Sequence, residues 1–327
     1  MLALYITIGV FLGIIVILFT LAALIHHISF GKRWDPDGVI KYYGIEDYPD
    51  LKEEYVEIST SKGALRGKLY FYSKDTHKGI LVFSHGMWGS HRAYLQEMQI
   101  LARNGFSVLG IDAFGTELSD GKNIKGLGNS LLSLNHAINY VKKNYPQEKI
   151  FVMGHSWGGF AAANISKYHN DITAIVAMSP FLSVGKILKH QLPKILYPTI
   201  PFIILVDAMH CGRYSFANAK KTLKSTRTKT LIIHSKDDQM VPYLTATGYL
   251  EKKLKNSNIK YYIVDGKKHN PDYTYEALEY TQAAFTKLKT IEPAEEKLEY
   301  RKNLDYHKMG EIDEKVFDDI LDFLNLS

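Results

Sequence analysis

The chain has 327 residues, of which 46% are hydrophobic and 23% charged. This composition is typical of a folded protein with a sizeable core, and it excludes a disordered or collagen-like chain. The single cysteine, Cys211, excludes an intrachain disulfide and any zinc or iron–sulfur site built on cysteines. Forty Lys and Arg residues against 34 Asp and Glu residues leave a net charge of +6, which permits contact with an anionic surface but does not indicate a nucleic-acid partner.

The N-terminal segment has the composition of a membrane span. Its first 31 residues contain no Asp, Glu, Lys or Arg, and about 20 apolar residues suffice to cross a bilayer, so we predict a transmembrane anchor over residues 1–31. A cleaved signal peptide is the alternative, but a basic leader, a short apolar core and a small-residue cleavage site are not evident. Lys32 and Arg33 follow the span directly, and the positive-inside rule then predicts that the rest of the chain lies on the cytoplasmic side.

After a predicted linker at residues 32–53, strands alternate with helices. The expected strands are 54–59, 64–72, 79–84, 106–112, 149–155, 172–178, 230–234 and 259–265. The expected helices are 91–104, 127–144, 158–168, 243–255 and 313–324. This alternation predicts an α/β fold over residues 54–327, with a mostly parallel sheet covered by helices on both faces. Two insertions interrupt it, a cap at 181–227 and a second, helical one at 271–310.

The cap is expected to cover the functional site, because it follows the strand after the central helix. It is rich in cations, and we expect its lysines at positions 220, 221 and 224 to face an anionic membrane. The apolar run 200–206 has two interpretations, contact with lipid or packing within the cap itself.

The strongest chemical motif is Gly-His-Ser-Trp-Gly-Gly at residues 154–159, between a predicted strand and a predicted helix. It is typical of a nucleophile elbow, in which glycines permit a tight turn that lifts the hydroxyl of Ser156 above the sheet. The N-terminus of the following helix favours negative charge at this point. We therefore interpret Ser156 as a nucleophile.

A serine nucleophile needs a base and an acid that orients the base. Both are expected at the carboxyl ends of later strands. Asp237 and Asp238 follow the strand at 230–234, and His269 follows the strand at 259–265. The order Ser, Asp, His is thereby complete, with two adjacent candidates for the acid.

These features resemble the α/β-hydrolase-fold serine hydrolases, in the branch of monoacylglycerol-lipase-like esterases and serine aminopeptidases. The matching motifs are Ser-His-Gly at 84–86, the elbow, an Asp three residues before the Val-Pro pair at 241–242, and a late His followed by Asn. The resemblance covers about residues 54–325 and implies the α/β-hydrolase fold with a triad of Ser156, Asp238 and His269. It departs at Glu117, where a glycine is common in the family's loop.

Acyl transfer produces an oxyanion, which requires two preorganised N–H donors. One is expected at the backbone of Trp157, directly after the nucleophile. The resemblance implies that the second is the backbone N–H of Met87. His85 is expected to brace this loop by a hydrogen bond, with substrate contact as the alternative, and His234 is expected to be structural. No metal ion, organic cofactor or nucleic-acid partner is expected.

The sequence thus predicts a membrane-anchored serine hydrolase that cleaves carboxylic esters with an apolar acyl chain, with membrane lipid esters among the candidate substrates. A serine peptidase and an acyltransferase are the alternatives. A peptidase needs an acidic or polar clamp for a free amine, for which the insertions offer Asp207, Glu276 and Glu279. Because no triad residue lies in the anchor, removal of residues 1–31 is expected to leave a soluble, active enzyme.

Overall fold

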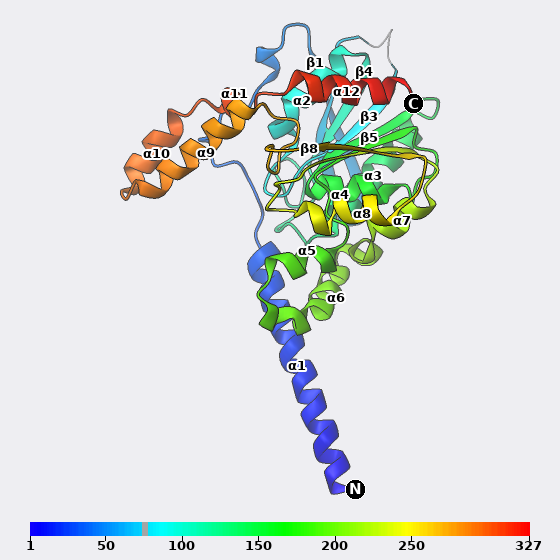
Figure 1. Cartoon of the computed structure of the whole chain (residues 1–327), viewed down its shortest axis with the longest axis vertical. Helices are drawn as coiled ribbons and strands as arrows, with labels where there is room; N and C mark the ends of the chain where they lie inside the picture. Colours follow the sequence, from blue (N-terminus) through cyan, green and yellow to red (C-terminus); the bar gives the residue numbers. More distant parts are fainter. Residues whose placement is uncertain (74–77) are drawn as a thin grey trace.

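The computed structural model of the chain describes residues 1–73 and 78–327 and is built around an eight-stranded sheet (Figure 1). The strands are β1 (Lys52–Thr60), β2 (Gly63–Phe71), β3 (Gly79–Ser84), β4 (Phe106–Ile111), β5 (Ile150–His155), β6 (Ala174–Met178), β7 (Lys229–Ser235) and β8 (Ile259–Val264). Their order is β1-β2-β4-β3-β5-β6-β7-β8, with β2 antiparallel to both of its neighbours and all other pairs parallel. All eight predicted strands are confirmed.

Burial on both faces explains the continuous apolar sequences of the central strands. Every residue of β3, β4, β5 and β6 is buried, as is typical of parallel strands that lie between two layers of helices. The helices α2 (Leu95–Arg103) and α12 (Glu314–Asn325) cover one face. The helices α3 (Asn129–Asn144), α4 (Trp157–Ile165) and α8 (Thr247–Lys253) cover the other. Short 3-10 turns occupy the starts of two expected helices, at His91–Tyr94 and Tyr243–Thr245.

Both insertions are helical, as predicted. The cap contains α5 (Val184–Gln191), a 3-10 segment (Lys194–Thr199), α6 (Ile200–Cys211), a second 3-10 segment (Gly212–Phe216) and α7 (Ala219–Ser225). The second insertion contains α9 (Tyr275–Thr290), α10 (Ala294–Lys302) and α11 (Tyr306–Met309). Figure 1 shows α9 and α10 extending away from the sheet as an arm, far from the cap.

One of the three α7 lysines expected to face the membrane contacts the domain instead. Helix α7 packs on α4, whereas α6 is the cap helix that packs along the N-terminal helix. The Nζ atom of Lys220 donates a hydrogen bond to the hydroxyl of Tyr249 in α8, at 2.9 Å. Lys220 therefore contacts the domain, whereas Lys221 and Lys224 are exposed, and their expected membrane-facing role stays a prediction.

The N-terminal helix α1 (Leu2–Phe30) stands out from the domain and reaches it only with its last turns (Figure 1). Two described segments, Leu2–Phe30 and Lys194–Ser225, are long and apolar enough to cross a membrane, a property that signal sequences and buried core helices share. Ala22 and Phe30 belong to the same buried cluster as the sheet residues, and His26 is buried beside them. The structure thus differs from the expected tether, because the end of α1 is part of the folded domain.

Candidate active site

The elbow has the geometry that its glycines predicted. Ser156 lies between β5 and α4 with φ of 55° and ψ of −108°, a backbone conformation that a side chain adopts only under strain. Its amide donates a hydrogen bond to the carbonyl of Met178, at 2.9 Å, which holds the turn against β6. A side chain at Gly158 would overlap the carbonyl of Ser84, so only glycine fits there.

Asp238 is the carboxylate that meets His269, and four donors surround it. Its Oδ2 atom lies 2.8 Å from Nδ1 of His269 and 3.0 Å from Nε2 of His234. Its Oδ1 atom accepts the backbone N–H groups of Met240 and Val241, at 2.8 and 2.9 Å. Burial by itself would raise the pKa of Asp238, but the hydrogen bonds from His234, His269 and Val241 outweigh it and hold the pKa well below its usual range.

The neighbouring acid has a different role. The Oδ1 atom of Asp237 accepts the hydroxyl of Ser235 and the backbone N–H of Lys268, the latter at 3.1 Å. It therefore ties two loops together and makes no hydrogen bond with His269. His234 is structural, as expected. Its direct hydrogen bond to Asp238 was not predicted, although the two residues are only four positions apart in the sequence.

His269 offers its second ring nitrogen to the cavity. The Nε2 atom is buried and has no hydrogen-bond partner among the described residues. Ser156 and His269 line the same cavity, but the structure contains no hydrogen bond between the Ser156 hydroxyl and this nitrogen. Catalytic hydrogen bonds of this kind are often long in unliganded sites and shorten when substrate binds.

A buried hydrogen-bond chain joins His269 to the loop after β3. His155 Nε2 donates to the carbonyl of His269 at 2.9 Å, and the hydroxyl of Ser179 donates to the same oxygen at 2.9 Å. The Nδ1 atom of His155 lies 2.9 Å from the hydroxyl of Tyr94, whose oxygen also accepts the backbone N–H of Gly86 at 3.1 Å. Burial lowers the pKa of His155 to about 3, so the ring is neutral and each bond in the chain has one donor and one acceptor.

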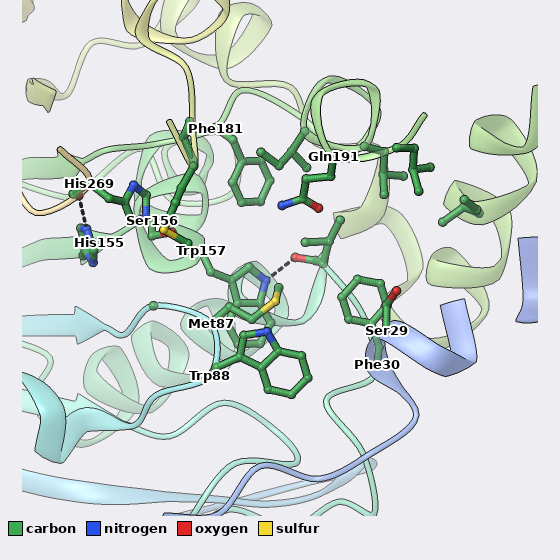
Figure 2. Close-up of a pocket in the computed structure, with 18 of the residues that line it drawn as sticks. Ser29, Phe30, Met87, Trp88, His155, Ser156, Trp157, Phe181, Gln191 and His269 are labelled. Carbon is green, nitrogen blue, oxygen red and sulfur yellow. Dashed lines mark hydrogen bonds between the residues drawn. The ribbon is translucent and has the colours of Figure 1, made fainter. Parts of the chain in front are cut away.

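The two expected oxyanion donors both border the cavity. Trp157 is the first residue of α4, where a backbone N–H has no acceptor within its helix. Its indole Nε1 donates to the carbonyl of Leu127 at 2.7 Å, the bond drawn beside Met87 in Figure 2. The ring is thereby fixed beside the elbow.

His85 braces the loop, in line with the first of its two predicted roles. It is 2% exposed, its Nδ1 atom lies 2.7 Å from the carbonyl of Gly86, and its Nε2 atom accepts the backbone N–H of Ala113 at 3.0 Å. Burial lowers the pKa of His85, which keeps the ring neutral. The ring lies behind the loop and does not border the cavity that Ser156 and His269 line.

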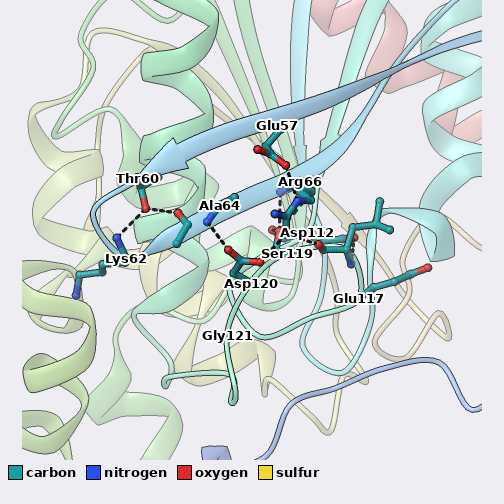
Figure 3. A network of polar contacts seen from close by, with 12 residues as sticks. Glu57, Thr60, Lys62, Ala64, Arg66, Asp112, Glu117, Ser119, Asp120 and Gly121 are labelled. Carbon is teal, nitrogen blue, oxygen red and sulfur yellow. Dashed lines mark hydrogen bonds and ion pairs between the residues drawn. The ribbon is translucent and has the colours of Figure 1, made fainter.

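A polar network joins the loop at residues 112–121 to neighbouring segments of the domain (Figure 3). Glu117 has φ of 31°, the region that favours glycine, and its carboxylate pairs with Arg92 at 2.7 Å. In β2, Arg66 binds Glu57 of β1 at 2.7 Å and Asp120 of the loop at 2.5 Å. The first pair fixes the carboxylate of Glu117, and the Arg66 pairs fix the loop to β1 and β2.

A cavity of about 480 Å³ opens beside Ser156 and His269. No Asp, Glu, Lys or Arg occurs among the described residues that line it, and most of its wall is apolar. In Figure 2, Ser156 and His269 lie at one end, Phe181 and Gln191 along one side, and Met87 and Trp88 along the other. Among the residues that the structure describes, no group of three or more His, Cys, Asp or Glu side chains could hold a metal ion.

Comparison with known proteins finds similar sequences among serine hydrolases. Residues 75–204 match the family model described as serine aminopeptidase, S33. Cutinase 1 of Thermobifida cellulosilytica is 25% identical over 135 residues, which cover 40% of this chain and about half (50%) of that cutinase. Cutinase 2 of the same organism is 22% identical over 221 residues, 67% of this chain and 71% of its own length.

Solved structures share the fold at low sequence identity. An esterase of Pyrococcus furiosus is 22% identical with a TM-score of 0.58, over 79% of this chain and 98% of its own. Est1E of Butyrivibrio proteoclasticus, solved with ferulic acid bound, is 20% identical with a TM-score of 0.55, over 71% and 97%. An acylaminoacyl peptidase of Pyrococcus horikoshii is 14% identical with a TM-score of 0.55, over 86% and 42%. The sheet order and the similar solved structures show that the chain has the α/β-hydrolase fold.

Proposed function

We propose that the protein is a membrane-anchored carboxylic ester hydrolase that acts on esters with an apolar acyl chain. The observation that carries this proposal is the uncharged, mostly apolar cavity that ends at Ser156 and His269. Such a cavity excludes water from an acyl chain and offers nothing to pair with a charged group. The esterases and cutinases among the similar proteins support the same reaction class.

The proposed reaction has two steps. The Oγ atom of Ser156 bonds to the acyl carbon while Nε2 of His269 takes the hydroxyl proton, and the ester C–O bond breaks as that proton passes to the leaving alcohol. Water then gives a proton to the same nitrogen and attacks the acyl-enzyme, which releases the carboxylic acid and returns the proton to Ser156. Asp238 supports both steps, because its ionised carboxylate keeps the proton of neutral His269 on Nδ1 and stabilises the imidazolium.

The backbone amides of Met87 and Trp157 are the proposed oxyanion donors. Both residues border the cavity, and the Trp157 amide lies at the N-terminus of α4, which favours negative charge. The bracing of His85 and the hydrogen bond between Tyr94 and Gly86 support this role, because they hold the loop that carries Met87.

An ester is favoured over a peptide with a free amine. Asp207, the one acid offered by the cap, is buried and accepts the backbone N–H groups of Leu127 and Gly128 at 2.5 and 3.1 Å. It therefore has its own donors and does not line the cavity, and Glu276 and Glu279 of α9 do not line it either. An acyltransferase would use the same acyl-enzyme with an alcohol in place of water.

Helix α1 is the proposed membrane anchor. Its composition also fits a signal sequence, but burial of Ala22, His26 and Phe30 within the domain favours a helix that is retained. The proposed orientation, with the domain in the cytoplasm, rests on the cations after the span. Arg33 binds backbone carbonyls, including Ser119 at 2.7 Å, so Lys32 is the cation of this pair that remains for the membrane surface. A phosphatase that is active only after export is expected to be inactive when fused to the C-terminus, because the C-terminus would lie in the cytoplasm. An active fusion would contradict the proposed orientation.

The central test is covalent labelling of the full-length protein in detergent. A fluorophosphonate probe is expected to modify Ser156, and Ser156→Ala is expected to abolish the labelling. Ser166→Ala, at the other end of α4 and outside the cavity, serves as the matched control and is expected to label normally. Labelling that persists in Ser156→Ala would place the nucleophile elsewhere.

A substrate panel then separates the reaction classes. p-Nitrophenyl esters of graded chain length are expected to be hydrolysed, with higher kcat/KM for longer chains, and aminoacyl anilides are expected to be poor substrates. Faster cleavage of the anilides would favour a peptidase. Transfer of most of the acyl group to added alcohol, at low alcohol concentration, would favour an acyltransferase.

A further inference from the structure

The last turns of α1 form part of the cavity wall. Ile25, Ser29 and Phe30 line the same cavity as Ser156 and His269. Figure 2 shows Ser29 and Phe30 at one end of the cavity and Ser156 and His269 at the other. An acyl chain that begins at Ser156 and extends along this cavity therefore reaches the membrane helix.

This end of α1 is fixed to the cap. His26 Nε2 lies 3.8 Å from Oδ2 of Asp207, and the His26 ring stacks on His210 with centroids 5.5 Å apart. About two helical turns earlier, Phe19 contacts Phe202 of α6 edge to face, with centroids 6.4 Å apart. The helix therefore has a defined position against α6.

The chain directly after α1 is fixed to the loop at residues 112–121. The Trp34 amide donates to the carbonyl of Gly115 at 3.0 Å, and the Glu117 amide donates to the carbonyl of Trp34 at 3.1 Å. Arg33 binds the carbonyls of Ser119 and Gly121 at 2.7 and 3.1 Å. The part of the cavity wall that α1 forms is therefore held by contacts both before and after residue 30.

The surface around this wall is apolar and continues into α1. Ile195, Leu205 and Met209 are exposed by 84%, 47% and 73%, and they belong to the cap segments that pack against α1. At about 1.5 Å per residue, about 20 residues cross the hydrocarbon core of a bilayer. A span that starts at Leu2 therefore ends near Ala22, at the level of the contact with the cap. The occupant that this surface fits is bilayer lipid.

We propose that the end of α1 is part of the acyl-binding site, and that the enzyme takes its ester from the bilayer in which α1 is inserted. The acyl chain lies between α1 and the cap residues Ile187, Leu188 and Ile203, with its carbonyl at Ser156. It enters along α1 and α6, so its apolar surface is not transferred through water. This inference rests on the proposed function, because it requires an acyl group on Ser156.

Accessibility of a cysteine at position 29 tests the acyl site. Ser29→Cys is nearly isosteric, and the native Cys211 is only 1% exposed, so background modification is expected to be low. Ser156 is first modified with a methyl or a dodecyl fluorophosphonate, and the rate of maleimide labelling is then measured in detergent. The dodecyl adduct is expected to slow the labelling of Cys at position 29 at least tenfold, and the methyl adduct less than twofold.

Ile28→Cys is the matched control, because Ile28 is 72% exposed and does not line the cavity. Neither adduct is expected to change its labelling rate. Equal rates for the two adducts at position 29 would overturn the acyl site while leaving the ester hydrolase intact. Failure of both fluorophosphonates to modify Ser156 would instead overturn the proposed function, and this inference with it.

A second measurement tests delivery from the bilayer. The full-length protein is reconstituted in dioleoylphosphatidylcholine vesicles, with p-nitrophenyl palmitate either in the same vesicles or in separate, protein-free ones. Hydrolysis is expected to be at least tenfold faster in the shared bilayer, and the difference is expected to vanish in detergent micelles. Equal rates in the two vesicle arrangements would overturn delivery through the bilayer.

Discussion

The imidazole of His155 donates its Nε2 proton to the carbonyl oxygen of His269, across 2.9 Å. The residue directly before the candidate nucleophile thus supports the backbone of the candidate base, 114 positions later in the chain. The Nε2 atom can donate in either protonation state, whereas acceptance of the Tyr94 hydroxyl proton at Nδ1 requires a neutral His155 ring.

Acid is expected to destabilise the protein through His155. The unfolded chain binds a proton on this side chain below its ordinary pKa of 6.5, whereas burial lowers the folded pKa to about 3. Its contribution to stability is therefore complete above about pH 6.5 and falls as the pH drops toward 3. His155→Gln is expected to show a smaller fall in Tm between pH 7 and 4 than the wild type. Tyr94→Phe keeps the imidazole and is expected to retain the wild-type slope; equal slopes for all three proteins would contradict this role of His155.

Asp238→Asn is expected to lower kcat by a factor of about 10⁴. The amides of Met240 and Val241 both donate to Oδ1, so the amide oxygen of Asn will take that position and its NH₂ group will face His269. His269 must then accept at Nδ1 and carry its proton on Nε2, where it cannot receive the proton of Ser156. Asp237→Asn is the matched control and is expected to cost less than about tenfold, because it alters only loop hydrogen bonds. Turnover of one soluble ester by both variants decides between the two acids.

Asp207→Ala is expected to destabilise the protein by about 3 kcal/mol or more. The change leaves the amides of Leu127 and Gly128 and the hydroxyl of Ser215 without their buried acceptor, and it removes the partner of His26. Asp171→Ala removes a half-exposed carboxylate that pairs with Lys142 and is expected to cost under about 1 kcal/mol. Thermal unfolding in detergent compares the two variants, and equal losses would show that Asp207 does not hold the cap.

Asp272→Asn is expected to stabilise the protein at high pH. Burial raises the pKa of Asp272, and burial together with the charge of Asp272 raises the pKa of Glu97. An acid with a raised folded pKa contributes its full stability below its ordinary pKa of 3.8 and loses it as the pH rises. The gain in Tm is therefore expected to grow from pH 4 to pH 8.

The exposed Asp322 of α12 provides the control for this change. Asp322→Asn is expected to leave stability within about 0.5 kcal/mol of the wild type at each pH. A gain from Asp272→Asn that is independent of pH would show that the buried carboxyl is not the cause.

Much of the fold could be predicted from the sequence because its signals are local. The apolar run of β3 identifies a strand buried on both faces, and the glycines around Ser156 identify the turn that presents the hydroxyl. The position of the acid before Val241 also agrees with the structure, because the backbone amides of the same short loop hold the carboxylate.

The contacts between distant segments could not be predicted from the sequence. The sequence contains no sign that α1 borders the cavity, because membrane composition is the same for a tether and for a helix that packs on a cap. The sequence likewise does not reveal that Asp207 accepts backbone N–H groups, or that Lys220 donates to Tyr249 of α8. Local periodicity determines which residues form helices and strands, whereas the partner of a buried charge depends on which segments the whole chain brings together.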